Sequence, residues 1–80
     1  MERILVIDFG GQYAHLIVNR LRRLGFYTEL CGNNEALHEA KRKGVMGLVF
    51  SGGPASVYEN GAPSVDKRIF SLGIPILGIC

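Results

Sequence analysis

The sequence has 80 residues, a formal net charge of +2, 48% hydrophobic residues and two cysteines. This length allows at most one small domain, and its small, scattered positive charge provides no basic patch for a nucleic acid. Two cysteines are too few for a disulfide scaffold, and the sequence contains neither an apolar membrane span nor an export signal. We therefore expect a cytoplasmic protein that binds neither nucleic acid nor membranes.

The first strand and the first helix have the clearest patterns. Residues 4–7 form a continuous apolar run that ends in the glycine-containing turn Asp8–Gln12, as expected of a buried strand. From residue 13 the apolar residues recur with a helical period, and Gly25 is placed to end that helix. The expected inner face consists of Tyr13, Leu16, Ile17, Leu21 and Leu24.

The second strand and the second helix have weaker signals. Residues 26–31 form a short run interrupted by Glu29, which predicts a strand near a sheet edge. In the turn that follows, Asn33 or Asn34 could cap a helix over Glu35–Lys43. The apolar stripe of this helix is thin and consists of Ala36, Leu37 and Ala40.

Two more apolar runs follow in the second half of the chain. Val45–Phe50 predicts a third buried strand, and residues 74–79 predict a fourth strand that is buried on both faces. Between them, the polar and turn-rich residues 55–63 are typical of an irregular surface loop. Ser64 is then placed to cap a short helix over Val65–Leu72.

The alternation of strands and helices predicts the fold class. It is typical of an α/β protein with a flavodoxin-like, doubly wound parallel sheet, present here as its N-terminal four-strand portion. Right-handed crossovers place the carboxyl ends of all the strands along one edge, where ligands and catalytic groups collect. Three segments should meet at that edge: Asp8–Gln12, Ser51–Pro54 and Cys80.

Cys80 is the candidate nucleophile, although many free cysteines are simply small buried hydrophobes. Attack of a thiolate on a carboxamide creates an oxyanion, to which Gly52 and Gly53 can offer unscreened backbone N–H groups. The plain alternative is an ordinary Gly-Gly-Pro turn. His15 and His38 lie in predicted helices, and no motif makes either of them the base for Cys80. No spacing of cysteines and histidines predicts a metal site.

The turn Asp8–Gln12 fits neither the dinucleotide-binding spacing nor the phosphate loop with its lysine. An aspartate that leads a glycine turn commonly accepts hydrogen bonds from the backbone of that turn. We therefore expect Asp8 and Gln12 to shape the site without transferring protons.

Three motifs, in this order, resemble the class I (triad) glutamine amidotransferases: Asp-Phe-Gly-Gly-Gln-Tyr at residues 8–13, Phe-Ser-Gly-Gly-Pro at 50–54 and Pro-Ile-Leu-Gly-Ile-Cys at 75–80. The second and third motifs are shared across the class, including anthranilate and carbamoyl-phosphate synthases. The first motif, with its Gln-Tyr, resembles the corresponding motif in the branch of the family that aminates XMP to GMP. The resemblance covers the whole chain and implies that residues 1–80 are the N-terminal portion of an amidotransferase domain, truncated at the expected nucleophile.

The resemblance implies that Cys80 attacks the side-chain amide of glutamine, forms a glutamyl thioester and releases ammonia. Gly53 would be the oxyanion-hole glycine, and Gly52 would lie beside it in the same loop. The ammonia would pass to an ATP pyrophosphatase domain or subunit that requires ATP and Mg²⁺, whereas this portion requires no cofactor.

The departure from the family lies at the end of the sequence. The family's Gly-x-Gln segment after the cysteine, and the His and Glu of its triad, are not among these 80 residues. We therefore expect the 80-residue chain alone to be inactive. The alternatives are a non-catalytic fragment or interaction piece, the amidotransferase portion of another class I enzyme, and another cysteine hydrolase on a flavodoxin-like sheet.

Overall fold

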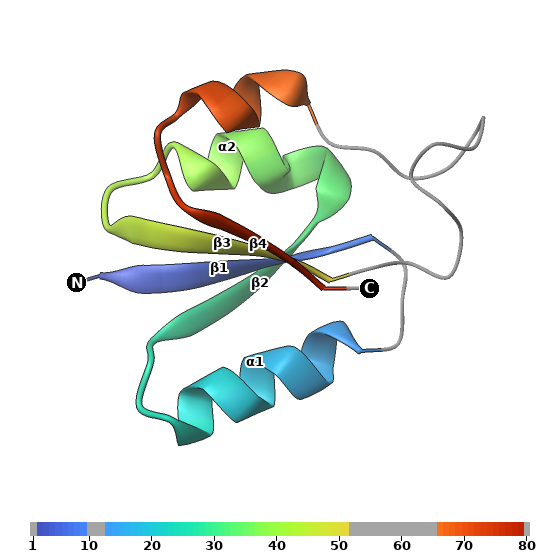
Figure 1. The fold of residues 1–80 in the computed structure, drawn as a ribbon, viewed down its shortest axis with the longest axis vertical. Coiled ribbons are helices and arrows are strands. Elements are labelled where there is room, and N and C mark those ends of the chain that lie inside the picture. The colour runs from blue at the N-terminus through green and yellow to red at the C-terminus, as the bar shows by residue number, and fades with distance from the viewer. Residues whose placement is uncertain (1, 10–12, 52–65, 80) are drawn as a thin grey trace.

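The computed structural model describes residues 2–9, 13–51 and 66–79 (Figure 1). The strands are β1 (Arg3–Asp8), β2 (Thr28–Gly32), β3 (Val45–Ser51) and β4 (Ile76–Ile79). The helical elements are α1 (Ala14–Arg23), η1 (Asn33–Glu35), α2 (Ala36–Ala40) and η2 (Lys67–Ser71). All described strand pairs are parallel and the strand order is β2-β1-β3-β4, which confirms the predicted α/β fold and places β2 at an edge, as expected.

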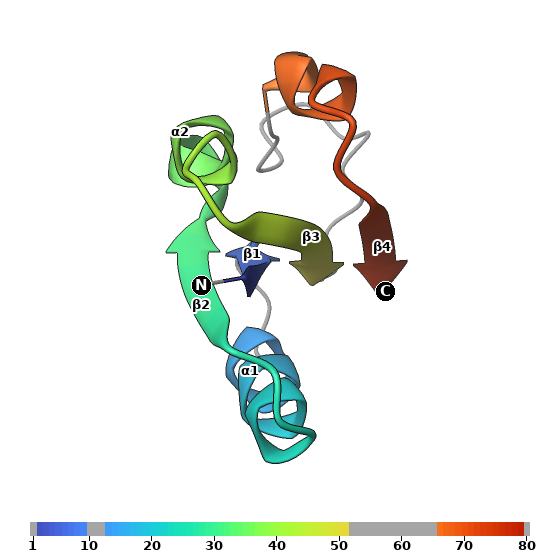
Figure 2. The ribbon, with the colours of Figure 1, turned by 90° about the vertical axis from the view of Figure 1, so that its left-hand side faces the viewer.

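Helices cover both faces of the sheet (Figure 2). α1 packs on one face, hereafter the α1 face, while α2 and η2 lie on the other, hereafter the α2 face. Alternate residues of β1 enter the two cores: Val6 packs with α1, whereas Leu5 and Ile7 pack with α2. This double burial explains why the strand sequence is continuously apolar.

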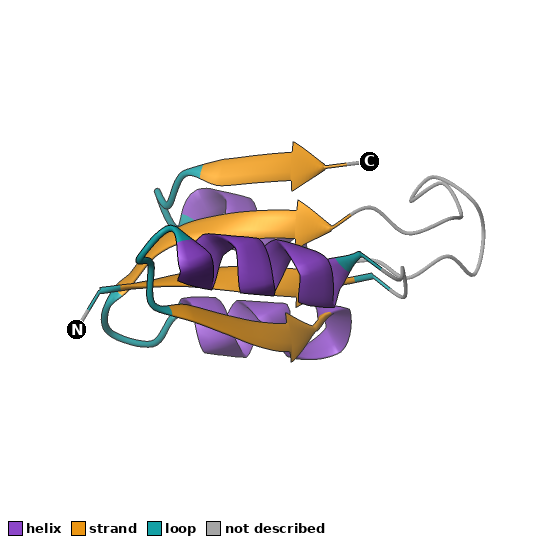
Figure 3. Cartoon of the chain, turned by 90° about the horizontal axis from the view of Figure 1, so that it is seen from below, coloured by secondary structure: helices purple, strands orange, loops and turns teal. Residues whose placement is uncertain are grey.

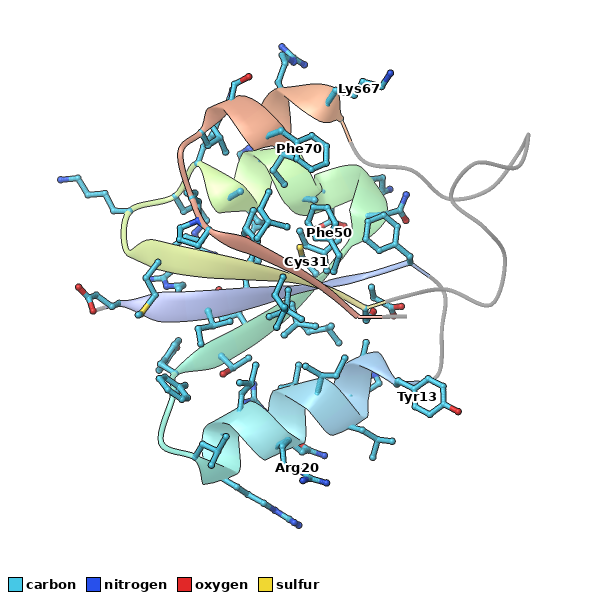
Figure 4. All side chains as sticks on the ribbon, in the orientation of Figure 1. Tyr13, Arg20, Cys31, Phe50, Lys67 and Phe70 are labelled. Atoms are coloured by element: carbon cyan, nitrogen blue, oxygen red, sulfur yellow. The ribbon has the colours of Figure 1, made fainter. Side chains whose placement is uncertain are left out.

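The helix α1 has the predicted position but a different inner face. Its buried residues are Ala14 and Val18, and Ile17 and Leu21 pack partly against them. Three residues predicted to face inward are instead 61–67% exposed: Tyr13, Leu16 and Leu24. The prediction of the inner face was therefore wrong for these three residues and correct for Ile17 and Leu21. The smaller side chains of Ala14 and Val18 form the centre of the contact with β1 instead. Figure 4 shows Tyr13 pointing away from the sheet.

The second predicted helix is shorter and begins differently. It consists of the 3₁₀ turn η1 followed by the five-residue α2, and neither element has a side-chain cap at its start. The predicted caps Asn33 and Asn34 lie inside η1, because β2 continues through Gly32 and pairs there with Asp8. The predicted apolar stripe is confirmed, since Ala36 and Ala40 are buried in the core with Leu37 packed against them.

The third predicted helix is a 3₁₀ helix, η2. Its cap is Asp66, whose carboxylate accepts a 3.0 Å hydrogen bond from the backbone N–H of Arg68. Hydrogen bonds from the side chain and the backbone of Arg68 lower the pKa of Asp66 to about 2. The predicted cap Ser64 lies outside the described residues, and Ile69 is the residue of η2 that is completely buried.

The last strand was predicted to be buried on both faces, and this is wrong for the part of the chain that the structure describes. β4 lies outside β3 in the strand order, and Leu77 is 59% exposed on the α1 face. Because α1 lies over β1 and β2, β3 and β4 retain an open apolar recess of about 240 Å³. Its lining includes Met46, Val49, Pro75 and Leu77. Within the described ranges, no helix combines the length and apolar character needed to cross a membrane.

Candidate active site at the carboxyl edge of the sheet

The carboxyl ends of the strands form one edge of the sheet, because all four strands point in the same direction (Figure 3). The register aligns their last residues: Asp8 pairs with Ser51, and Ser51 pairs with Ile79. In the sequence, Asp8 begins the glycine-containing turn, Ser51 immediately precedes Gly-Gly-Pro, and Ile79 immediately precedes Cys80. The structure therefore brings the starting points of the three predicted segments together on adjacent strands.

The candidate nucleophile and the candidate oxyanion donors lie outside the described residues. These are Cys80, Gly52 and Gly53, and the role assigned to each stays a prediction. In the proposed arrangement we expect the N–H of Gly53 to lie within roughly 6 Å of the Cys80 sulfur, a distance between residues outside the described ranges. Of the predicted shaping residues, Asp8 ends β1, whereas Gln12 lies outside the described part.

Ser51 is a residue of this edge to which the sequence assigned no separate role. Its side chain is fully buried, and its Oγ donates a 3.0 Å hydrogen bond to the backbone carbonyl of Ile7. A buried hydroxyl is costly unless it is paired, so this bond ties the end of β3 to β1. The sequence does contain one indication of this role. Ser51 follows Val49 by two positions and so lies on the same face of the strand, where an apolar residue would continue the pattern.

Aromatic side chains join the first two motifs on the α2 face. Phe9 is buried, and its ring packs edge to face on Phe50 with ring centroids 5.4 Å apart. Phe50 in turn contacts Phe70 of η2, with centroids 6.0 Å apart (Figure 4). Such pairs contribute about 0.5–1.5 kcal/mol beyond the area they bury. Neighbouring ends of β1 and β3 are thus fixed to each other on both faces of the sheet.

The two histidines occupy the positions expected of ordinary helix residues. His15 is exposed on α1, and the side chain of His38 is 86% exposed on α2, on the opposite side of the sheet. In residues 2–9, 13–51 and 66–79, no three His, Cys, Asp or Glu side chains gather as metal ligands would.

Cys31 is the other cysteine of the chain, and its surroundings suppress its reactivity. It lies on β2, partly buried against the α2-face core. Burial, together with the nearby carboxylates Glu39, Glu35 and Glu29, raises the pKa of its thiol to about 11. The thiol is therefore protonated at neutral pH, which makes Cys31 a poor nucleophile.

Comparison with known proteins identifies the family. A family model described as "Glutamine amidotransferase class-I" matches residues 5–80. A GMP synthase [glutamine-hydrolyzing] of Pyrobaculum aerophilum is 52% identical over 80 residues, which is 100% of this chain and 16% of that protein. A probable GMP synthase of Leptospira interrogans is 57% identical over 79 residues, covering 99% of this chain and 13% of that protein. The corresponding Aquifex aeolicus GMP synthase is 56% identical over 77 residues, 96% of this chain and 15% of its own length.

These relatives are much longer than the sequence in hand, which spans 13–16% of their length. The match nevertheless covers nearly all of this chain and includes the three motifs whose strands meet at the carboxyl edge. The chain belongs to the class I glutamine amidotransferase family.

Proposed function

We propose that this chain provides the nucleophile-bearing part of a glutamine amidotransferase that supplies ammonia for the synthesis of GMP. The observation that carries the proposal is the strand register, which aligns Asp8, Ser51 and Ile79, one residue from each of the three motifs. Family membership supports the reaction class, and the relatives named as glutamine-hydrolyzing GMP synthases support the product. Other class I enzymes share the second and third motifs but differ in what they do with the ammonia.

In the proposed reaction, the thiolate of Cys80 attacks the side-chain amide carbon of glutamine and forms a C–S bond. The backbone N–H of Gly53, with Gly52 beside it in the loop, would stabilise the oxyanion of the tetrahedral intermediate. The C–N bond then breaks, the nitrogen takes a proton and leaves as ammonia, and a glutamyl thioester remains. Water cleaves the thioester to give glutamate and restores the thiol.

Proton transfer in this reaction requires a base, and the described histidines are not placed for that role. His15 and His38 are both exposed on helices that lie on opposite faces of the sheet. In the family the base is a His supported by a Glu. As the resemblance implies, the positions of this His and Glu in the family's triad are not among these 80 residues. We therefore propose that a polypeptide of residues 1–80, produced by itself, does not hydrolyse glutamine, since loss of base catalysis alone costs about 10²–10⁴ in rate.

The proposed partner is an ATP pyrophosphatase domain or subunit, which would use ATP and Mg²⁺ to activate XMP before ammonia attacks it. We place this assembly in the cytoplasm, in line with the sequence-based expectation. No cofactor is proposed for residues 1–80 themselves.

The test uses the product of the intact gene, so that the protein carries whatever follows Cys80 in nature. With glutamine, ATP, Mg²⁺ and XMP, we expect GMP to form together with glutamate. Hydrolysis of glutamine without GMP formation would instead indicate another class I enzyme, or a pyrophosphatase that is a separate subunit and has to be added to the assay. Absence of glutamine hydrolysis from the intact product would contradict the amidotransferase function and favour a non-catalytic interaction piece.

A further inference from the structure

We infer that Ser51 is a positioning residue for glutamine hydrolysis, because its buried hydroxyl fixes the point where the chain leaves β3 for the Gly-Gly-Pro segment. This inference rests on the proposed function. It concerns a residue that does not itself touch glutamine in the proposed reaction. Its effect would be exerted through the backbone that immediately follows it.

The position of Ser51 in β3 argues that its hydroxyl serves a purpose. Side chains alternate along β3, so Ser51 lies on the same face as Val49, which is buried in the α1-face core. An apolar side chain here would continue that core without burying a polar atom. The chain instead places a hydroxyl at a site with 0% exposure, where an unpaired hydroxyl would cost about 1–3 kcal/mol.

The hydrogen bond of Ser51 is directed away from β4 and toward β1. Its Oγ donates to the carbonyl of Ile7, a residue 44 positions earlier in the chain, across the β1–β3 pair. On the opposite face, the preceding residue, Phe50, packs edge to face on Phe9. The last two residues of β3 are therefore anchored to β1 from both sides, and the next residue in the sequence is Gly52.

This anchoring has a specific kinetic consequence in the proposed mechanism. Oxyanion donors act only if they are held where charge develops in the transition state, and a displacement of about 1 Å can cost ~100-fold in rate. Glutamine in its ground state carries no oxyanion, so its binding should be nearly insensitive to the same displacement. Loss of the Ser51 hydroxyl should therefore lower kcat about 10- to 100-fold and change KM little.

Thr28 provides a matched control at the other end of the sheet. It is also a buried hydroxyl residue, 3% exposed, and its Oγ1 donates a 3.1 Å hydrogen bond to the backbone carbonyl of Phe26. It begins β2, at the amino edge of the sheet. Thr28→Val removes the same kind of buried bond while keeping the side-chain volume, so it should reduce stability without lowering kcat.

The experiment compares Ser51→Ala with Thr28→Val in the intact gene product, measuring glutamate release for kcat and KM together with thermal stability. A second readout is the rate at which iodoacetamide alkylates Cys80, followed on its peptide by mass spectrometry. This substitution reaction forms no oxyanion, so Ser51→Ala should leave its rate unchanged while kcat falls. Ser51→Thr, which keeps the hydroxyl, should recover most of kcat.

Two results would overturn the inference while leaving the proposed function intact. One is a Ser51→Ala enzyme with the wild-type kcat, and the other is an equal loss of kcat in Thr28→Val. If Ser51→Ala does not fold, Ser51→Cys fills a similar space with a weaker donor and should show a kcat below those of the wild type and of Ser51→Thr, and a wild-type kcat in Ser51→Cys would then overturn the inference. Glutamine hydrolysis that persists in Cys80→Ala would instead overturn the proposed function, and this inference with it.

Discussion

The two edges of the sheet hold their side chains in different ways. At the amino edge, Glu29 and Glu39 form ion pairs with Arg3 and Arg42 at N–O distances of 2.7–3.8 Å, with part of each side chain open to solvent. At the carboxyl edge, Ser51 is fully buried and bonded to the backbone of the neighbouring strand. Exposed ion pairs are easily replaced by water, whereas a buried directional bond fixes the backbone. The hydrogen bond of Ser51 therefore fixes the backbone at the carboxyl edge more firmly than the ion pairs fix the amino edge.

Among the substitutions at the two edges, Cys80→Ala is expected to have the largest effect on glutamine hydrolysis. Without the thiol no thioester can form, so glutamine hydrolysis should fall to background while synthesis from added ammonia persists. Cys31→Ala is the matched control, because that thiol packs against the α2-face core and is protonated at neutral pH. Both variants would be assayed for glutamate release and for ammonia-dependent product formation. Equal activity in the two variants would remove Cys80 from the mechanism.

A second prediction concerns the reactivity of Cys31, which lies near the carboxyl edge on β2. The thiol pKa is raised from 9.0 to about 11, so at pH 8 Cys31 carries about 100-fold less thiolate than an ordinary cysteine. We expect correspondingly slow alkylation of Cys31 by iodoacetamide in the folded protein and a normal rate in urea, measured on its peptide. Similar rates in both conditions would contradict the protected environment.

The same shift fixes the sign of a pH effect on stability. The folded state holds the Cys31 proton more tightly than the unfolded state, so this contribution is fully present below pH 9 and declines as the pH rises toward 11. In Cys31→Ala this decline should be smaller. Urea unfolding at pH 8 and pH 10 would measure the difference between the two proteins.

A third prediction concerns Asp8, which ends β1 beside Ser51. If it shapes the glycine turn without transferring protons, Asp8→Asn should cost about 1 kcal/mol, seen as lower stability or a roughly fivefold change in kcat/KM. The pH profile of kcat should keep its shape. Complete loss of activity in a folded Asp8→Asn protein would make Asp8 a participant in the chemistry.

The sequence predicted the sheet well because three of its four strands lie in continuous apolar runs, as expected of strands in a parallel sheet. It could not predict how α1 is rotated, since two apolar stripes overlap along the helix. Only the contact with β1 selects the stripe of Ala14 and Val18 over that of Leu16 and Leu24. The cap of η2 at Asp66 likewise depends on where that short element begins, and polar residues are frequent in the preceding loop.

The sequence could predict where the candidate site lies, but not the contacts that hold the ends of β1 and β3 together there. The common direction of the strands places the three motifs at one edge, and it follows from the alternating pattern of elements. The strand order comes from the structure. The hydrogen bond from Ser51 to Ile7 joins residues 44 positions apart, and it depends on a strand register that no local pattern specifies. The ring contact between Phe9 and Phe50 depends on the same register.

The smallest effects are expected at the amino edge, where two carboxylates can be compared. Glu29 approaches Arg3 at 3.8 Å and Arg42 at 3.2 Å. The Arg3 side chain is only 16% exposed, and its Nε and Nη1 atoms have no hydrogen-bond partner among the residues that the structure describes. Glu29→Gln removes the charge that faces this largely buried cation and should reduce stability by up to about 1 kcal/mol. Glu39 pairs with the exposed Arg42, three positions later and just past the end of α2, so Glu39→Gln should have a smaller effect that disappears in 1 M salt. Urea unfolding at low and high salt would measure both, and neither variant should change kcat for glutamine hydrolysis. A loss of kcat in either one would mean that the amino edge, too, controls the geometry of the site.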